Sequence, residues 1–130
     1  MHSHRMTRHI YLVRHGLPHF PGEGSWCLGT ADFGLSTLGR LQACQLGEAL
    51  KGKELNVFSS PLGRAYGTAQ FLSDKPIVLD QLREMHTGDW DGLCFEEIKK
   101  RWPVRVWIWC RCCRYNWIRP PERWAKTFST

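Results

Sequence analysis

The stretch that most constrains the fold is residues 10–16, where a short apolar run leads directly into Arg14, His15 and Gly16. Residues 10–13 are apolar or aromatic, and this composition favours a short buried strand over a helix. Gly16 and Pro18 end the strand. In open α/β sheets, ligands bind at the carboxyl ends of the strands. The sequence therefore predicts that Arg14 and His15 lie at a ligand-binding edge.

Arg14 and His15 are the residue types of a site that combines a nucleophile with an anion ligand. An imidazole can act as a nucleophile, and a guanidinium binds phosphate or carboxylate oxygens through paired N–H groups. Gly16 allows the backbone to turn sharply and a ligand to approach closely. A solvent-exposed turn is the commoner origin of such a tripeptide, so the assignment depends on the elements that follow.

The rest of the chain predicts alternating helices and strands. A loop rich in Gly and Pro, residues 17–33, is either functional or a surface connection. Ser36 is a good N-cap for a helix that runs to about residue 50, with Leu38, Leu41 and Cys44 on the face that covers the sheet.

Two further strands and two further helices are expected after residue 52. The strands are 55–58 and 77–79, and the helices are 61–72 and 94–102. Strands that alternate with helices in this way predict an α/β fold with a parallel sheet.

Arg64 lies in the first turn of the predicted helix 61–72. Right-handed crossovers place the ends of parallel strands on one edge, so Ser59, Ser60 and Arg64 should lie near His15. A cation at the positive end of a helix is unfavourable unless an anion is held there. Arg64 is therefore a second candidate anion ligand, and the alternative is a solvent-exposed arginine.

Glu84 is the candidate general acid. It lies in residues 82–92, a segment that mixes acids, a histidine, glycines and a tryptophan. A carboxyl group beside a bound anion keeps its proton more readily, which suits donation to a leaving oxygen. The alternatives are an ordinary loop carboxylate and an ion pair with Arg83.

Four segments together resemble the histidine phosphatase superfamily, the phosphoglycerate mutase-like proteins. They are residues 12–16 (LVRHG), 34–43 (GLSTLGRLQA), 59–69 (SSPLGRAYGTA) and 82–92 (LREMHTGDWDG). The resemblance implies a three-layer α/β/α sandwich with a mostly parallel sheet, here truncated.

The resemblance also implies roles for the four candidate residues. His15 would be the nucleophile that becomes phosphohistidine, and Glu84 the general acid toward the leaving alcohol. Arg14 and Arg64 would hold the phosphoryl oxygens. The implied reaction is hydrolysis of a small phosphorylated metabolite, with α-ribazole phosphate among the candidates, and it needs neither a metal nor another cofactor.

The family has a second catalytic histidine on a later strand, whereas no histidine of this chain follows His86. An inactive truncated fragment is therefore one alternative, and a phosphoglycerate mutase-type phosphotransferase is another. The later strands of the sheet are missing as well. Because a parallel sheet without them has an unpaired edge, we expect poor solubility or dependence on a partner.

The composition changes abruptly after residue 103. Residues 104–130 carry four of the 7 Trp and three of the 6 Cys, together with five of the arginines, and they show no regular period. We interpret this tail as the product of a shifted reading frame. Zinc ligation through Cys110, Cys112 and Cys113 and stacking on single-stranded nucleic acid are weaker alternatives.

The predicted organisation is a disordered extension over residues 1–8, a partial histidine phosphatase domain over 9–103 and the atypical tail over 104–130. No apolar stretch is long enough to span a membrane, and the N-terminus lacks the apolar core of a signal peptide. The unevenly spaced cysteines indicate free thiols in a reducing compartment. We therefore expect a cytoplasmic protein that binds neither membrane nor nucleic acid; its oligomeric state stays open.

Overall fold

The computed structural model describes residues 8–105, and in this range helices and strands alternate as the sequence predicts. The elements are α1 (Thr37–Ala49), β1 (Phe58–Ser59), α2 (Gly63–Ala69), β2 (Ile77–Val78), the 3₁₀ turns η1 (Asp80–Leu82) and η2 (Gly88–Trp90), and α3 (Phe95–Arg101). The strands β1 and β2 are parallel, with Phe58 opposite Ile77 and Ser59 opposite Val78. The α/β class with a parallel sheet is confirmed, and within the described residues the sheet has two strands.

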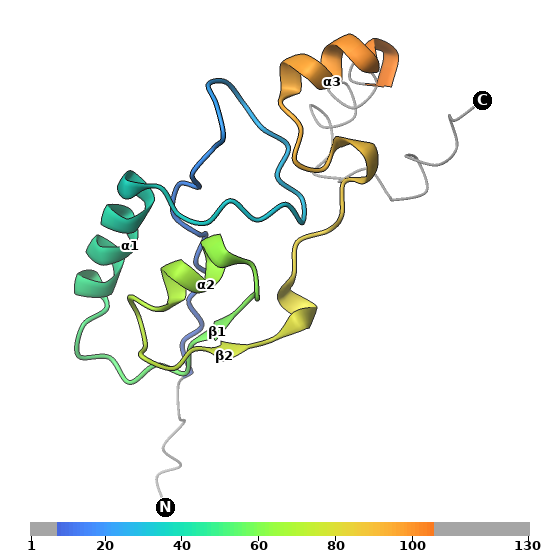
Figure 1. Cartoon of the computed structure of the whole chain (residues 1–130). Coiled ribbons are helices and arrows are strands. Elements are labelled where there is room, and N and C mark those ends of the chain that lie inside the picture. Colours follow the sequence, from blue (N-terminus) through green and yellow to red (C-terminus); the bar gives the residue numbers. More distant parts are fainter. Residues whose placement is uncertain (1–7, 106–130) are drawn as a thin grey trace, which may run out of the picture.

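The helices are spread along an elongated molecule. Figure 1 shows α1 and α2 side by side, with β1 and β2 next to α2 and with α3 at the opposite end from α1. The N-terminal extension predicted over residues 1–8 lies outside the described residues except for Arg8, and the tail predicted over 104–130 lies outside them except for residues 104–105.

Helix α1 begins as predicted. Ser36 has extended backbone angles (φ −71°, ψ 168°), and its side-chain oxygen accepts a hydrogen bond from the N–H of Gly39 at 3.0 Å. This bond satisfies one of the backbone donors that a helix leaves without a partner in its first turn. The start of α1 is therefore determined by a local signal that is visible in the sequence.

The face of α1 that is buried differs from the predicted one. Leu38 and Leu41 are 52% and 54% exposed, whereas Gly39 and Ala43 are buried. A Cβ atom on Gly39 would lie 2.1 Å from the carbonyl oxygen of Leu17, and one on Gly16 would lie 2.4 Å from that of Gly39. The helix therefore approaches the backbone that follows His15 so closely that only its small residues fit at the contact.

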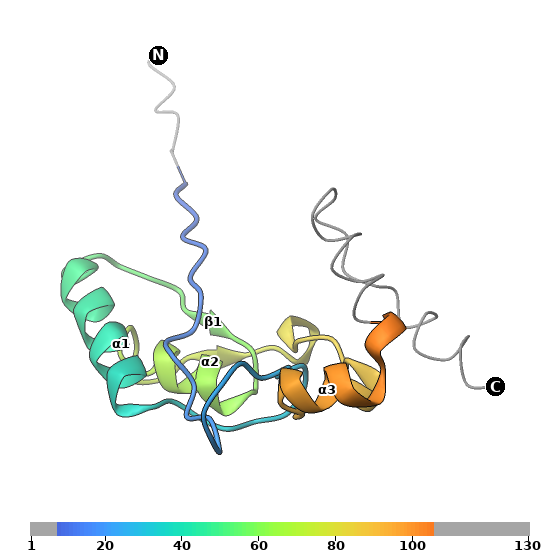
Figure 2. The same cartoon turned by 90° about the horizontal axis from the view of Figure 1, so that it is seen from above.

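The prediction of a buried strand over residues 10–13 is wrong. These residues form no regular strand, and Ile10 and Leu12 are 86% and 95% exposed. Figure 2 shows this first described segment leading away from the helices. A strand needs a neighbour to pair its backbone groups, and among the described residues the one ladder joins β1 to β2.

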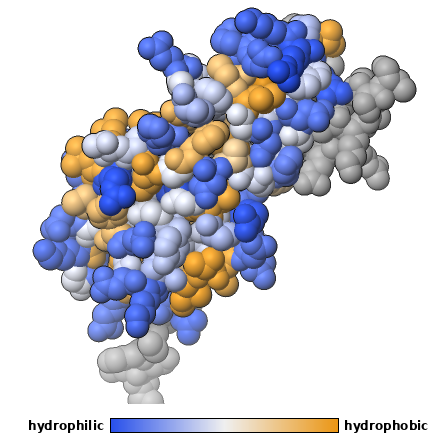
Figure 3. All heavy atoms as spheres, viewed as in Figure 1, coloured by the Kyte–Doolittle hydropathy of each residue, from blue (hydrophilic) through white to orange (hydrophobic). Residues whose placement is uncertain are grey.

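Other large apolar side chains are also exposed, among them Phe58 of β1 and both residues of β2. Figure 3 shows apolar surface at the end of the molecule from which the N-terminal trace leaves. Across residues 8–105, no helix has the length and apolar character needed to cross a membrane.

The exposed apolar residues predict self-association of the isolated chain. Replacing Ile10 and Leu12 together by Lys should lower both binding of the dye ANS and the aggregated fraction in sedimentation. The physical reason is that both side chains expose large apolar surfaces to water.

The single substitution Ile98→Lys, at a fully buried position, serves as the control. It should increase dye binding because it disrupts the packing of α3. A wild-type chain that stays monomeric, binds no dye and unfolds in one sharp reversible transition would contradict the prediction.

Candidate functional site

His15 and Arg14 line one cavity of about 260 Å³. Its other lining residues come from the turn after His15 and from the facing sides of α1 and α2: Gly16, Gln42, Ala43, Leu46 and Thr68. The cavity thus unites two of the four predicted site residues. It combines an imidazole with a guanidinium, as the sequence predicts.

One ring nitrogen of His15 forms a hydrogen bond with the backbone. Its Nδ1 lies 2.7 Å from the carbonyl oxygen of Gly16. A carbonyl oxygen can only accept a hydrogen bond, so Nδ1 carries the proton. In the neutral ring, Nε2 then holds the lone pair. The backbone of Gly16 therefore selects the tautomer in which Nε2 can act as a nucleophile.

Three side chains hold the turn that follows His15. The N–H of Gly16 donates to Thr68 Oγ1 at 3.0 Å, and the N–H of Leu17 donates to Gln42 Oε1 at 2.9 Å. The hydroxyl of Ser36 donates to the carbonyl oxygen of Leu17 at 2.9 Å. The sequence alone did not identify Thr68 or Gln42 as site residues. A usable signal for Thr68 is its position one helical turn after Arg64.

Arg64 is buried, with 3% of its surface exposed, so the alternative of a solvent-exposed arginine is wrong. Its Nη1 donates to the carbonyl oxygen of Ala31 at 2.6 Å, and its Nη2 donates to that of Gly29 at 2.7 Å. Arg64 does not line the cavity of His15. It is linked to that cavity through Thr68, whose hydroxyl donates to the Arg64 carbonyl oxygen at 2.8 Å.

An anionic side chain binds the N-terminal end of α2 next to Arg64 in the chain. The carboxylate of Asp32 accepts a hydrogen bond from the N–H of Gly63 at 2.7 Å. Ser59 and Ser60 are buried close by, and neither lines the cavity of His15. The first turn of α2 is therefore joined to the Gly- and Pro-rich loop by Asp32 as well as by Arg64.

Glu84 lies between η1 and η2, on a segment without regular structure. It is half-buried, and its Oε1 accepts a hydrogen bond from the N–H of Met85 at 3.0 Å. Arg83 forms an ion pair with Asp80 at 2.8 Å. Glu84 does not line the cavity of His15, so the structure does not bring it together with Arg14 and His15.

Asp91 is the centre of a hydrogen-bond cluster that the sequence did not predict. Its Oδ1 accepts from the N–H of Thr30 at 2.9 Å and from the hydroxyl of Thr87 at 2.7 Å. Its Oδ2 accepts from the hydroxyl of Thr30 at 2.6 Å and lies 3.8 Å from Nε2 of His86. Burial acts to raise the pKa of Asp91, but the hydrogen bonds from Thr30 and Thr87 outweigh it, so the pKa is lowered.

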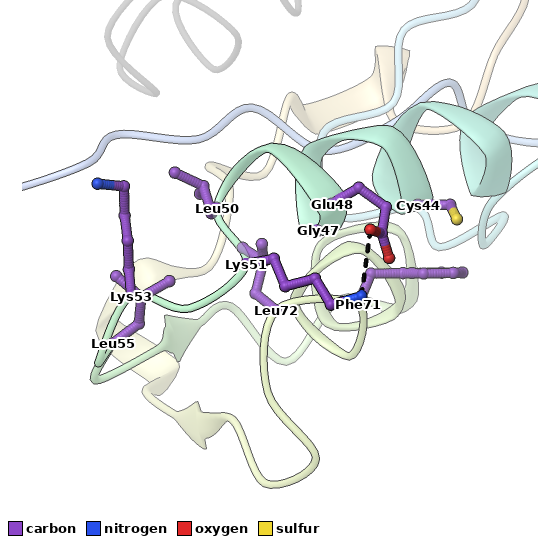
Figure 4. Close-up of a pocket in the computed structure, with 9 residues that line it drawn as sticks. All are labelled: Cys44, Gly47, Glu48, Leu50, Lys51, Lys53, Leu55, Phe71 and Leu72. Atoms are coloured by element: carbon purple, nitrogen blue, oxygen red, sulfur yellow. Dashed lines mark hydrogen bonds and ion pairs between the residues drawn. The ribbon is translucent and has the colours of Figure 1, made fainter.

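A second cavity, of about 270 Å³, lies between the end of α1 and the residues that follow α2. Figure 4 shows its lining, which includes Phe71 and the ion pair between Lys51 and Glu48. None of the four predicted site residues lines it. We therefore assign it no part in the chemistry of His15.

Cys27, Cys44 and Cys94 are free thiols, as predicted for the part of the chain that the structure describes. Burial raises the pKa of the Cys27 thiol, and the negative charge of Asp91 adds to this effect. Within residues 8–105, no three or more His, Cys, Asp or Glu side chains are grouped as metal ligands. The proposed zinc ligands Cys110, Cys112 and Cys113 lie outside this range.

Comparisons with known proteins agree with the resemblance. A family model for the histidine phosphatase superfamily (branch 1) matches residues 10–128. A glucosyl-3-phosphoglycerate phosphatase of Mycolicibacterium vanbaalenii is 37% identical over 124 residues, which cover 92% of this chain and 51% of that protein. A 2,3-bisphosphoglycerate-dependent phosphoglycerate mutase of Pelagibacter ubique is 33% identical over 102 residues, which cover 72% of this chain and 42% of that protein.

The fold is also similar to solved structures. A mycobacterial glucosyl-3-phosphoglycerate phosphatase matches with a TM-score of 0.64 and 39% identity, covering 73% of this chain and 47% of that one. The chain thus spans about half the length of the curated relatives it matches. The family match runs past residue 103, and the domain boundary predicted there stays a prediction.

The cluster around Asp91 predicts a loss of stability in acid. Because folding lowers the pKa of Asp91, the ionised carboxylate stabilises the folded state. This contribution to the free energy of unfolding is fully present above the unfolded-state pKa, about 3.9. The contribution is lost as the pH falls through the still lower pKa of the folded state. Asp91→Asn should reduce the unfolding free energy at neutral pH by about 1.5–3 kcal/mol, the value of hydrogen bonds to a charged group.

Denaturant unfolding between neutral and strongly acid pH measures this effect. The curves for wild type and Asp91→Asn should converge in acid, while Asp74→Asn, on an exposed loop, should follow wild type throughout. A constant difference between wild type and Asp91→Asn at every pH would show that the charge contributes nothing.

Proposed function

The chain belongs to the histidine phosphatase superfamily, and we propose that its role is phosphoryl transfer from a phosphate monoester to Nε2 of His15. The observation that carries this proposal is the 2.7 Å contact between Nδ1 and the Gly16 carbonyl oxygen. It leaves the Nε2 lone pair as the nucleophile of a ring that lines the same cavity as Arg14. The activity of the intact domain would then be phosphomonoester hydrolysis.

The proposed reaction has two steps. In the first, the Nε2 lone pair forms a bond to phosphorus while the bond to the leaving oxygen breaks, and Glu84 gives that oxygen a proton. In the second, water attacks the phosphohistidine, the N–P bond breaks, and the Glu84 carboxylate accepts a proton from the water. Arg14 and Arg64 would hold the non-bridging oxygens and stabilise their negative charge.

The support differs among the four residues. Arg14 and His15 line one cavity, which gives their pairing a geometric basis. Arg64 uses two guanidinium N–H groups on loop carbonyls, and a guanidinium has five such donors, so others can serve phosphoryl oxygens. The role of Glu84 rests on the family resemblance alone.

We expect turnover by this chain to be slow. The family's second histidine has no counterpart after His86, and His86 itself accepts a hydrogen bond from Gly88 and lies beside Asp91. A donor missing from a phosphoryl-transfer site costs charge stabilisation in the transition state. The competing proposal is a non-enzyme that retains a phosphate-binding half-site.

The proposed substrate class is a small phosphorylated metabolite. The names of two relatives contain phosphoglycerate, and we propose such an acid as the first substrate to try, followed by α-ribazole phosphate. Because one of these relatives is a mutase, a transferase is the second candidate. The two candidates differ in whether the phosphoryl group passes from His15 to water or to a second sugar acid.

A trapping experiment tests the proposal. The full chain, His15→Ala and His19→Ala are incubated with p-nitrophenyl phosphate at mildly acid pH, quenched in alkali and analysed by mass spectrometry. Wild type and His19→Ala should carry an acid-labile phosphoryl group on residue 15, and His15→Ala should carry none. His19 is the matched control because it lies in the same loop outside the cavity lining.

The release of p-nitrophenol should fall by about 10²–10⁴-fold in His15→Ala if His15 is the nucleophile. Equal release by all three proteins, with no phosphoryl group trapped, would overturn the proposal in favour of the non-enzyme. Transfer of the trapped group to an added sugar acid in preference to water would instead identify a mutase.

A further inference from the structure

We propose that Asp91 is a positioning residue for Arg64 and acts on it through the peptide group between Gly29 and Thr30. This inference deepens the proposed function, because it explains how the buried guanidinium is oriented for a phosphoryl group. Asp91 itself touches neither the cavity of His15 nor, in this proposal, the substrate.

The peptide group between Gly29 and Thr30 is bound at both ends by charged side chains. Its N–H donates to Asp91 Oδ1 at 2.9 Å, and its C=O accepts from Arg64 Nη2 at 2.7 Å. The N–H and the C=O of one peptide lie in a common plane and point in opposite directions. A carboxylate at one end and a guanidinium at the other therefore polarise this peptide in the same sense, which strengthens both hydrogen bonds.

A second carbonyl fixes the plane of the guanidinium. Nη1 of Arg64 donates to the carbonyl oxygen of Ala31 at 2.6 Å. The N–H of Ala31 in turn donates to the carbonyl oxygen of Leu28 at 2.7 Å, which closes a tight turn over residues 28–31. Two terminal nitrogens bound to two carbonyls of one turn leave the planar guanidinium little freedom to rotate.

The backbone at Gly29 is shaped for the approach of Asp91. Gly29 has a positive φ of 47°, and a Cβ atom there would lie 1.6 Å from Asp91 Oδ1. Any side chain at this position would therefore push the carboxylate away from the Thr30 N–H. The same Oδ1 also accepts from the N–H and the hydroxyl of Thr87, at 3.3 Å and 2.7 Å.

The alternative role for Asp91 is a purely structural link between two loops. The two roles depend on different contacts of the carboxylate. A structural link depends most on the shortest hydrogen bond, the 2.6 Å contact with the Thr30 hydroxyl. Positioning of Arg64 depends on the charge of Asp91 and on the Thr30 N–H, because these act on the peptide that the guanidinium binds.

The test compares Asp91→Asn with Thr30→Val in the full chain, and uses Thr30→Ser as the conservative control. The guanidinium ¹⁵N and ¹H resonances of Arg64 are observed by NMR, and inorganic phosphate is then titrated in. Asp91→Asn should shift and broaden the Arg64 signals and weaken phosphate binding about tenfold, the size expected when a charge-assisted hydrogen bond weakens. Thr30→Val should leave the Arg64 signals sharp and change phosphate affinity by less than about threefold.

The NMR signals of Arg64 and the affinity for phosphate separate positioning by Asp91 from phosphate binding by the site. Unchanged Arg64 signals in a folded Asp91→Asn protein, or equal effects of Asp91→Asn and Thr30→Val, would overturn positioning by Asp91. If the Arg64 signals respond as expected while wild type binds no phosphate, the positioning is supported and the proposed function fails.

An acid titration replaces the Asp91→Asn arm if that variant does not fold. It uses a His86→Gln background, because the His86 imidazole lies 3.8 Å from Asp91 Oδ2. The neighbouring Cys27 thiol stays protonated in acid and adds no charge, since its pKa is raised. The Arg64 signals should move as Asp91 gains its proton, before the chain unfolds. Signals that move only with global unfolding would overturn the proposal.

Discussion

The hydrogen bond from the Gly16 N–H to the Thr68 hydroxyl is the contact on which the site depends. It joins the turn after His15 to α2, and the same hydroxyl donates to the carbonyl oxygen of Arg64. One threonine thus links the proposed nucleophile to the proposed phosphate ligand. The Gly16 carbonyl oxygen accepts a hydrogen bond from His15 Nδ1, so the N–H and the C=O of Gly16 both contribute to the geometry of the site. A buried group left without its partner would cost about 1–3 kcal/mol, which favours this single arrangement.

Close packing by small residues makes that hydrogen bond possible. The backbones at Gly16 and Gly39 approach closely. A Cβ atom on Gly16 would lie 2.4 Å from the Gly39 carbonyl oxygen, and one on Gly39 would lie 2.1 Å from that of Leu17. Gly47 approaches the carbonyl oxygen of Phe71 in the same way, at 2.5 Å from its would-be Cβ. The helix α1 therefore contributes to the site by shape more than by apolar area. This explains why Leu38 and Leu41 of α1 are exposed although the helix packs closely against the site.

Local signals in the sequence predicted the parts of the structure that local interactions determine. The Ser36 cap and the approximate positions of the three helices belong to this group. The partners of hydrogen bonds between distant parts of the chain were not predicted: Thr68 is 52 residues from Gly16, and Asp91 is 61 residues from Thr30. The position of Thr68 one turn after Arg64 places it near the site but does not indicate that it binds Gly16. The strand over residues 10–13 failed for the related reason that strands form only with a partner.

The proposed chemistry requires that the Gly16 carbonyl oxygen hold His15 with its proton on Nδ1 and its lone pair on Nε2. The most direct test is long-range ¹H–¹⁵N NMR of the imidazole in the full chain at a pH where the ring is neutral, with His15→Ala used to assign the signals. We expect a protonated Nδ1 and a pyridine-type ¹⁵N shift for Nε2. A neutral His15 with its proton on Nε2 would overturn the proposed chemistry, because the lone pair would then lie on Nδ1, against the Gly16 carbonyl oxygen, and Nε2 could not attack phosphorus.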